Sequence, residues 1–248
     1  MKKVLYLPFL LLFFAGTAYA DPFDLFNYFL NTAPNRPAAQ KLLDYFAEDI
    51  GQAIAGGSYG VGGDLGLMGV KLSIKMSYQQ ISQDNEIIRA VGETTLTYPV
   101  IQGEFGIFED FDGILRLSNM NNSTLLGGGV RYRIREGDDM FVPTISIQSV
   151  YNFLIADDGD NKFNAWNLKT SPTAYFGQIP YIQPYVFISY DVTSLTAKSS
   201  ARSGLSSLVD GFGYGAGGNL SLGTVNVTGA ISMYNGNANY NFGIFIGI

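Results

Sequence analysis

The last ten residues, NYNFGIFIGI (239–248), decide the fold. One apolar set of side chains alternates here with a second set. The apolar set is Tyr240, Phe242, Ile244, Ile246 and Ile248. A period of two predicts a β-strand. An exposed strand with one apolar face would aggregate, whereas closure of the sheet removes the free edge and lipid covers the apolar face. Ten residues are about the length of one tilted transmembrane strand, so the tail predicts a membrane β-barrel.

The same alternation recurs upstream and predicts about ten strands. The clearest example is 70–78, where apolar residues alternate with Lys71, Ser73, Lys75 and Ser77. In the segment 94–108 the apolar phase shifts at Pro99, which predicts a bulge there. Outward aromatic residues are expected at both ends of the strands, which is typical of the two girdles of a membrane barrel. The fold class is therefore all-β, a closed antiparallel up-and-down transmembrane barrel.

The lengths of the connections agree with an even number of strands, for which alternate connections lie on opposite sides of the membrane and both ends of the barrel lie on one side. If the C-terminus lies in the periplasm, the connections near 79–93, 119–123, 155–162, 194–210 and 235–238 lie outside. The connections near 109–112, 136–139, 178–181 and 223–224 then lie inside, and all of these are short. Short periplasmic turns and longer outer loops are the expected pattern. We therefore expect both chain termini in the periplasm.

Two N-terminal segments precede the barrel. Residues 1–20 combine a basic start, a short apolar core and Ala18-Tyr19-Ala20, which predicts a cleaved signal peptide. In residues 21–57, apolar side chains recur at three- and four-residue steps from Pro37 to about Ala55, and Gly56 follows. That spacing predicts one amphipathic helix, either a plug or a periplasmic element. Residues 58–248 form the predicted barrel.

Composition excludes several functions. The chain contains no cysteine and no histidine, so disulfides, thiolate chemistry and the commonest general base are absent. Without Lys2 and Lys3, 13 basic residues face 21 acidic ones, a net charge of −8, which disfavours nucleic-acid binding. Asp157, Asp158 and Asp160 lack the glycine and glutamate positions of a calcium loop and predict a solvated hairpin tip. We expect no enzyme activity, no catalytic residue, no metal and no cofactor.

The side chains that alternate with the lipid-facing set should line the lumen. The charged members of this set are Lys71, Lys75, Glu104, Arg116, Arg131, Arg133, Arg135, Lys169 and Asp191. Seven of these are basic and two are acidic, which predicts an electropositive lumen. A narrow barrel fills itself with side chains, and buried cations need carboxylate partners. The helix offers Asp44, Glu48 and Asp49, so we hypothesise that it docks in or under the barrel and neutralises part of this wall.

The signal peptide, the tail from Tyr240 to Ile248 and the strand Ile182-Gln-Pro-Tyr-Val-Phe-Ile-Ser-Tyr-Asp-Val resemble small bacterial outer-membrane β-barrels. The tail departs from that class at its last residue, which is usually aromatic and here is Ile248. The resemblance implies an outer-membrane location, contact with membrane lipid and lipopolysaccharide, and insertion by the barrel-assembly machinery through the terminal strand. It covers the chain from about Gly57 onward and implies no cargo or oligomeric state.

Three functions follow from this pattern. The first is a porin-like or transport channel for small, anionic or amphipathic solutes. The second is a non-conducting structural or adhesive surface barrel. The third is a soluble secreted β-sheet protein that binds a ligand. Conductance separates the first from the second, and heat-modifiable gel migration separates both from the third.

Overall fold

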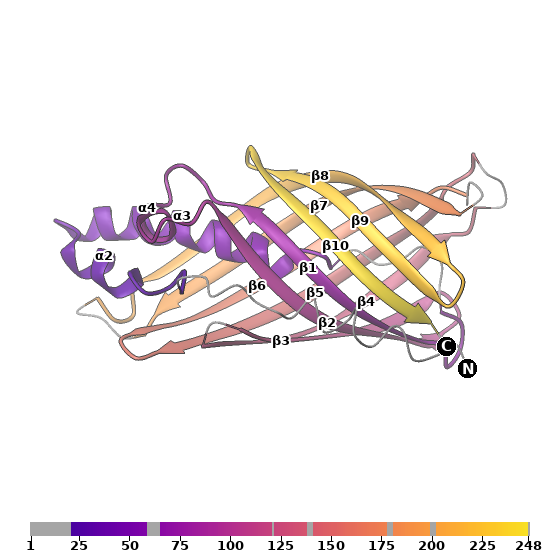
Figure 1. Ribbon diagram of the computed structural model, residues 1–248, viewed down its shortest axis with the longest axis horizontal. Coiled ribbons are helices and arrows are strands. Elements are labelled where there is room, and N and C mark those ends of the chain that lie inside the picture. The colour runs from indigo at the N-terminus through magenta and orange to yellow at the C-terminus, as the bar shows by residue number, and fades with distance from the viewer. Residues whose placement is uncertain are drawn as a thin grey trace.

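A computed structural model describes residues 21–58, 65–120, 122–137, 141–177, 181–198 and 202–247. Ten antiparallel strands close into one barrel, in which each strand pairs with its sequence neighbours and β1 pairs with β10 (Figure 1). The strands are β1 Val70–Gln80, β2 Thr95–Phe108, β3 Phe111–Met120, β4 Ser123–Arg135, β5 Thr144–Asp158, β6 Asn161–Tyr175, β7 Ile182–Ala197, β8 Ser206–Leu222, β9 Val225–Tyr234 and β10 Asn237–Gly247. The predicted fold class is confirmed.

The terminal strand closes the barrel as its alternation predicts. Its register with β1 runs from Lys71 opposite Gly247 to Gln79 opposite Asn239. Tyr240, Phe242 and Ile246 are between 42% and 50% exposed on the outer surface, whereas Asn239 and Asn241 are buried. This exposed apolar exterior is the surface that an outer-membrane barrel presents to lipid. Ile248 lies outside the described residues, and the role of the tail in assembly stays a prediction.

The described part of the chain holds three helices besides the barrel. The helix α3 (Arg36–Ala55) matches the predicted amphipathic helix. The preceding residue, Asn35, caps it, because its side chain accepts a hydrogen bond from the backbone N–H of Ala38. Two short helices were not predicted, α2 (Phe26–Thr32) and α4 (Glu86–Ala90). Because they contain only 7 and 5 residues, they show little periodicity. None of the described helices has the length and apolarity that a membrane span requires.

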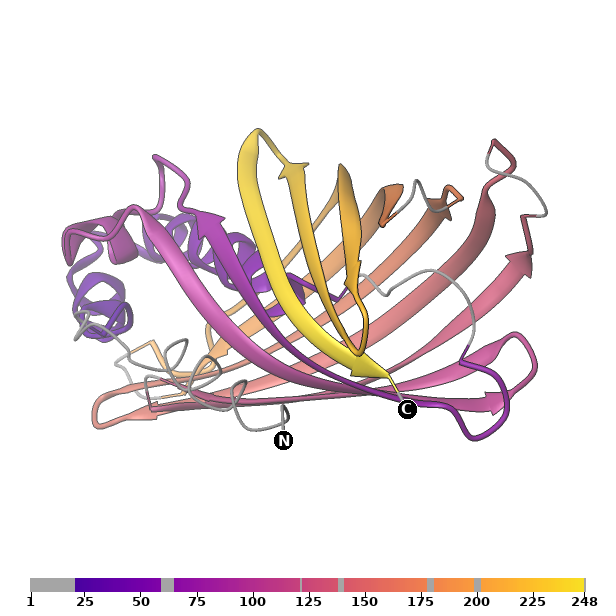
Figure 2. The same ribbon diagram turned by 45° about the vertical axis from the view of Figure 1, so that its right-hand side comes forward.

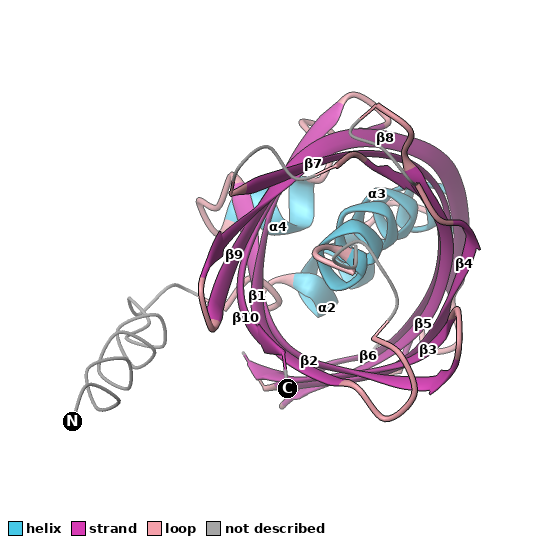
Figure 3. Cartoon of the chain, turned by 90° about the vertical axis from the view of Figure 1, so that its right-hand side faces the viewer, coloured by secondary structure: helices cyan, strands magenta, loops and turns pink. Residues whose placement is uncertain are grey.

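The helix α3 enters the barrel from one end. Viewed along the barrel, it lies within the ring of strands (Figure 3), and it contacts strands on several sides, namely β1, β2, β5, β6, β7 and β8. Its apolar stripe, with Leu43, Phe46, Ile50 and Ile54 fully buried, joins inward side chains of the wall in one hydrophobic core. This half of the barrel interior is therefore largely apolar.

That apolar half explains the phase shift in β2. Leu96, Tyr98 and Val100 point inward and pack in the core around α3, whereas Gln102 and Glu104 point inward further along the same strand. The inward face changes from apolar to polar without a change of register. The pairing with β1 runs unbroken through Pro99, so the predicted bulge at that residue is wrong. The register shift of β2 lies between Gly106 and Phe108, in the pairing with β3.

The helices lie at the end of the barrel opposite the rim at which β1 begins and β10 ends (Figures 1 and 2). Near the start of the described chain, the backbone N–H of Asn27 donates to the Oδ1 of Asn161 at the β5–β6 turn, 3.0 Å away. Gly247 lies opposite Lys71 at the other end. The start of α2 and the end of β10 therefore lie at opposite rims of the barrel. The side of the membrane that each rim faces stays a prediction. We call the rim that carries the helices and the β5–β6 turn the helix rim.

Candidate functional site

The predicted luminal charges lie mostly inside the barrel. Seven of the nine are buried, at 0–4% exposure: Lys71, Lys75, Glu104, Arg116, Arg131, Lys169 and Asp191. The other two lie near the rim opposite the helices. Arg133 is half-buried and pairs with Asp110 and Glu136, and Arg135 is exposed. The buried set forms the polar half of the interior, beyond the end of α3.

Glu104 lies at the centre of this polar half. Its carboxylate pairs with Lys71, with the Nη1 of Arg131 at 2.9 Å and with the Nζ of Lys75 at 3.9 Å. Arg131 also makes two contacts with the carboxylate of Asp112, which is 1% exposed. Charges removed from water need partners of opposite sign, and the carboxylate of Glu104 is the partner of three cations at once.

Sequence reasoning missed Asp112 because it placed the residue in the connection at 109–112. The strand β3 begins at Phe111, so Asp112 shares the inward face with Ile114 and Arg116. The alternation toward Arg116 was the signal that could have placed it. A further pair crosses from β6 to β7, where the Nζ of Lys169 lies 3.3 Å from the Oδ2 of Asp191. Four cations of the wall thus pair with acids that the strands themselves supply, namely Lys71, Lys75, Arg131 and Lys169.

Arg116 joins the wall to the C-terminus of α3. Its Nη1 donates to the carbonyl of Ile54 at 2.9 Å and to the Oδ1 of Asn152 at 2.8 Å, and its Nη2 donates to the carbonyl of Gly56 at 2.6 Å. The last carbonyls of a helix lack partners within the helix and carry a partial negative charge. A buried guanidinium is a suitable partner for both properties. Beyond the helix, the side-chain amide of Gln148 donates to the carbonyl of Ser58.

The helix carboxylates bind elsewhere. Asp44 accepts hydrogen bonds from Gln40 and from the hydroxyl of Ser207, and Glu48 accepts one from Asn235 at 2.7 Å. All of these partners lie at the helix rim or on the helix itself. The hypothesis that these side chains neutralise the basic wall is therefore wrong in its detail, because it is the C-terminus of the helix that meets the wall.

Asp49 is the fully buried member of the predicted acidic trio. Its carboxylate accepts hydrogen bonds from the side-chain amide of Asn85, at 2.7 Å, and from the backbone N–H of Ser82, at 3.1 Å. Burial raises the pKa of Asp49 to about 7, and the two hydrogen bonds oppose that rise. Asn85 in turn caps α4 through the backbone N–H of Ile88. Asp49 thus connects α3 to the loop between β1 and β2.

Two glycines, Gly51 within α3 and Gly56 directly after it, allow the helix to lie close against the wall. A Cβ on Gly51 would overlap the side chain of Thr193 on β7, and a Cβ on Gly56 would overlap Ser77 on β1. The glycine-rich stretch GYGAGG (213–218) fits the letters of the dinucleotide-binding motif G-x-G-x-x-G, which requires a strand before it and a helix after it. Here the whole stretch lies within β8, so the match is a coincidence. There, the rings of Phe187 and Tyr185 cover Gly215 and Gly217.

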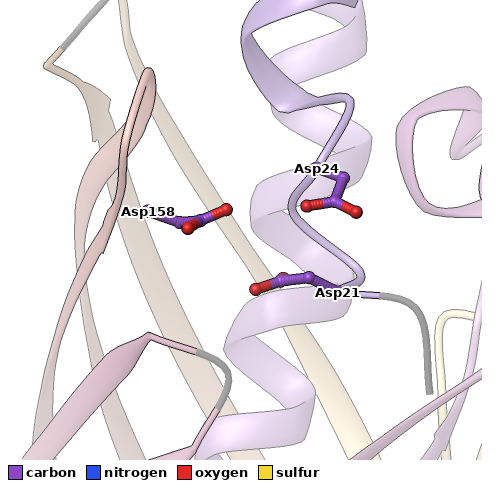
Figure 4. A group of neighbouring side chains, drawn as sticks. All are labelled: Asp21, Asp24 and Asp158. Carbon is purple, nitrogen blue, oxygen red and sulfur yellow. The ribbon is translucent and has the colours of Figure 1, made fainter. Parts of the chain in front are cut away.

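Three carboxylates meet beside the helix rim, and two of them were not singled out by the sequence. Asp21 and Asp24 precede α2, and Asp158 ends β5 (Figure 4). One carboxylate oxygen from each lies within 4.8 Å of the others. Partial burial raises the pKa of Asp21, and the charges of Asp158 and Asp24 raise it further. Asp157 pairs separately with Lys162, at 2.6 Å.

No protein-family model and no curated protein sequence matches the chain. Several solved structures are similar to it in fold. The attachment invasion locus protein Ail of Yersinia pestis is 10% identical, with a TM-score of 0.37 over 73% of this chain and 99% of that one. The translocator domain of the autotransporter NalP from Neisseria meningitidis is 11% identical, with a TM-score of 0.42 over 82% and 94%. The N-terminal β-barrel domain of Pseudomonas aeruginosa OprF is 14% identical, with a TM-score of 0.38 over 74% and 99%. These neighbours are outer-membrane barrels.

Proposed function

We propose that this protein is a non-conducting outer-membrane barrel whose own N-terminal helix closes its lumen, so that it serves as a structural or adhesive surface protein. One observation carries this proposal, the core that α3 forms with inward side chains of the wall. That core includes Leu96 of β2, Leu125 of β4, Leu154 of β5, Phe163 of β6 and Leu195 of β7, all 0–3% exposed. An apolar core that reaches strands on several sides of the ring excludes water and ions from that half.

The second half of the interior supports the same function. Ion pairs centred on Glu104 bridge β1, β2 and β4, and Lys169 pairs with Asp191 between β6 and β7. A solute that passed through the barrel would have to displace the helix core first and separate these pairs afterwards. Both steps expose groups that are costly to leave without partners.

The positions of the first and last strands support one orientation of the barrel in the membrane. We propose that the rim at which β1 begins and β10 ends faces the periplasm, because the first strand of a bacterial outer-membrane barrel begins, and its last strand ends, on that side. The helix rim then faces the cell exterior and presents α2, α4 and the start of α3. A protease added to intact cells, or an antibody against residues 21–35, would reach this segment in that orientation and would not in the opposite one.

Planar-bilayer recordings test the closed lumen directly. The purified full-length barrel is expected to show no steady conductance. A variant that lacks residues 21–57 removes the helix core and is expected to conduct, provided that heat-modifiable migration shows that it still folds. Steady, step-like conductance by the full-length protein would overturn the proposal.

A gated channel for anions is the second candidate. The observation that favours it is the charge of the buried wall, in which five cations (Lys71, Lys75, Arg116, Arg131 and Lys169) face three carboxylates (Glu104, Asp112 and Asp191). If α3 leaves the lumen during function, the opened pore is expected to prefer anions. A KCl gradient across a bilayer that contains the helix-deleted variant measures this preference through the sign of the reversal potential.

A further inference from the structure

The wall of the barrel separates between β2 and β3 near the helix rim. The ladder that joins these strands ends at Ile101 opposite Leu117. Beyond that rung, β2 continues to Thr95 and β3 continues to Met120. The same segments stay paired on their other sides, β2 with β1 and β3 with β4. Each strand therefore turns one free edge toward the other.

A pocket of about 320 Å³ occupies the place of the missing rungs. Continuing the register would put Pro99 opposite Asn119 and Val100 opposite Ser118, and all four residues line the pocket together with Ile101 and Leu117. Proline has no backbone N–H and is found at free edges of sheets, so Pro99 suits this place. We call the pocket the β2–β3 slot.

The slot opens outward and is closed on the inside. At its mouth, Ile101 and Leu117 are 43% and 49% exposed on the lipid-facing surface. At its back, Val100 and Tyr98 belong to the core around α3, and the Tyr98 hydroxyl is hydrogen-bonded to the hydroxyl of Ser123 across 3.1 Å. None of the described residues that line it is charged. The slot is thus a dead-end cavity with apolar walls and a few uncharged polar groups.

We propose that the β2–β3 slot binds an acyl chain of a membrane lipid. This inference rests on the proposed membrane location. The mouth faces the bilayer, and its apolar walls match a hydrocarbon chain, whereas the amide of Asn119 and the hydroxyl of Thr124 line the same slot and can bind the polar linkage of a lipid. In a membrane, a gap in the wall is filled by whatever surrounds it, and around this gap that is lipid. A β-strand of a partner protein could also pair with a free edge, but Pro99 offers no donor to such a strand.

The absence of cysteine permits single labels at chosen sites. We would attach bimane to Ser118→Cys in the slot, to Ser146→Cys as a buried inward control on β5, and to Leu126→Cys as a lipid-facing control on β4. Ser118 and Ser146 are 6% and 4% exposed, and Leu126 is 54% exposed. Each variant is reconstituted in vesicles of phosphatidylcholine with brominated acyl chains, which quench bimane on contact.

The slot predicts that position 118 is quenched at least half as strongly as position 126, whereas position 146 is quenched little. Quenching at 118 no greater than at 146 would overturn the proposal, and so would equal quenching at all three sites, because lipid would then reach the interior everywhere. No quenching at position 126 would instead show that the barrel is not inserted, and the proposed membrane location would fail.

A second measurement covers a label that prevents folding. Native mass spectrometry of the unlabelled protein, released from detergent, is expected to show a retained phospholipid. Ile101→Trp narrows the mouth of the slot and is expected to reduce that adduct several-fold, whereas Leu126→Trp on the same outer surface leaves it unchanged. Equal adducts in both variants, or an adduct that is a peptide, would contradict the assignment of an acyl chain.

Discussion

Arg116 and Gly56 lie 60 positions apart in the chain, and the guanidinium of one donates to the carbonyl of the other at 2.6 Å inside the barrel. This bond fixes the end of α3 to the inner wall of β3. It also marks the boundary between the two halves of the interior, the apolar half around the helix and the charged half around Glu104.

Replacing Arg116 should loosen the helix. Arg116→Met keeps much of the side-chain volume but removes the donors to Ile54, Gly56 and Asn152. A hydrogen bond to a charged group contributes about 1.5–3 kcal/mol, so the unfolding midpoint in urea should fall clearly. Brief channel openings should also appear in bilayers. Arg135→Met, at an exposed position on β4, is the control and should change neither property.

Gly51 should tolerate no side chain. In Gly51→Val the added atoms overlap Thr193, so α3 must move away from β7. Overpacking of this kind costs about 1–3 kcal/mol, which urea unfolding in detergent would show as a lower midpoint. Lys41→Val tests the same residue type at an exposed position of the helix and should cost only its small loss of helix propensity. Equal losses in the two variants would contradict the close approach of α3 to β7.

Glu104 should be essential for the stability of the charged half. Glu104→Gln keeps the shape of the side chain but leaves Lys71 and Arg131 without their shared carboxylate. Breaking a buried ion pair by removing one partner costs about 3–5 kcal/mol. The folded band in a heat-shift gel should therefore disappear at a lower temperature. Asp157→Asn breaks the exposed pair with Lys162 and should have almost no effect.

Asp49 should make the stability of the folded protein depend on pH. Because its pKa is about 7 in the folded state and near 3.8 when unfolded, the folded state holds the proton more tightly. Its contribution is thus fully present below about pH 4, declines as the pH rises toward 7 and is lost above that value.

Unfolding midpoints of the wild type and of Asp49→Asn across pH 4–8 measure this effect. The amide keeps an acceptor for Asn85 and Ser82 but cannot ionise, so the variant should lose part of the decline with pH and be the more stable protein at pH 8. Asp44→Asn controls for the loss of an acidic side chain from the same helix. Parallel curves for the wild type and Asp49→Asn would count against a titrating Asp49.

Much of the barrel could be predicted from local pattern alone. In the wall of a membrane barrel, every second residue faces the lipid and the others face the barrel interior. The alternation in the segments at 70–78 and 239–248 therefore indicates which of their side chains face outward. The same pattern put Lys71, Glu104 and Arg131 on the inward set, where the structure buries them. The helix from Pro37 to Ala55 could be predicted because its apolar stripe and the residues at its two ends are patterns within the segment itself.

The contacts between distant segments could not be read in this way. Alternation gives the face of a residue but not the neighbour across the lumen, so Asp112 was missed and Asp49 was paired with the wrong surface. The apolar phase of Leu96, Tyr98 and Val100 looked like a break in β2, because only the position of α3 makes an inward apolar side chain favourable there.

The sequence by itself thus determined the strands, their faces and the one long helix, since each depends on side chains two to four residues apart. Only the tertiary structure decided three further features. The helix enters from the rim opposite the start of β1 and the end of β10, its C-terminus meets Arg116, and β2 and β3 separate between Ile101 and the helix rim. These features depend on contacts that the closed barrel makes between residues tens of positions apart in the chain. The periodicity of the sequence gives no information about such contacts.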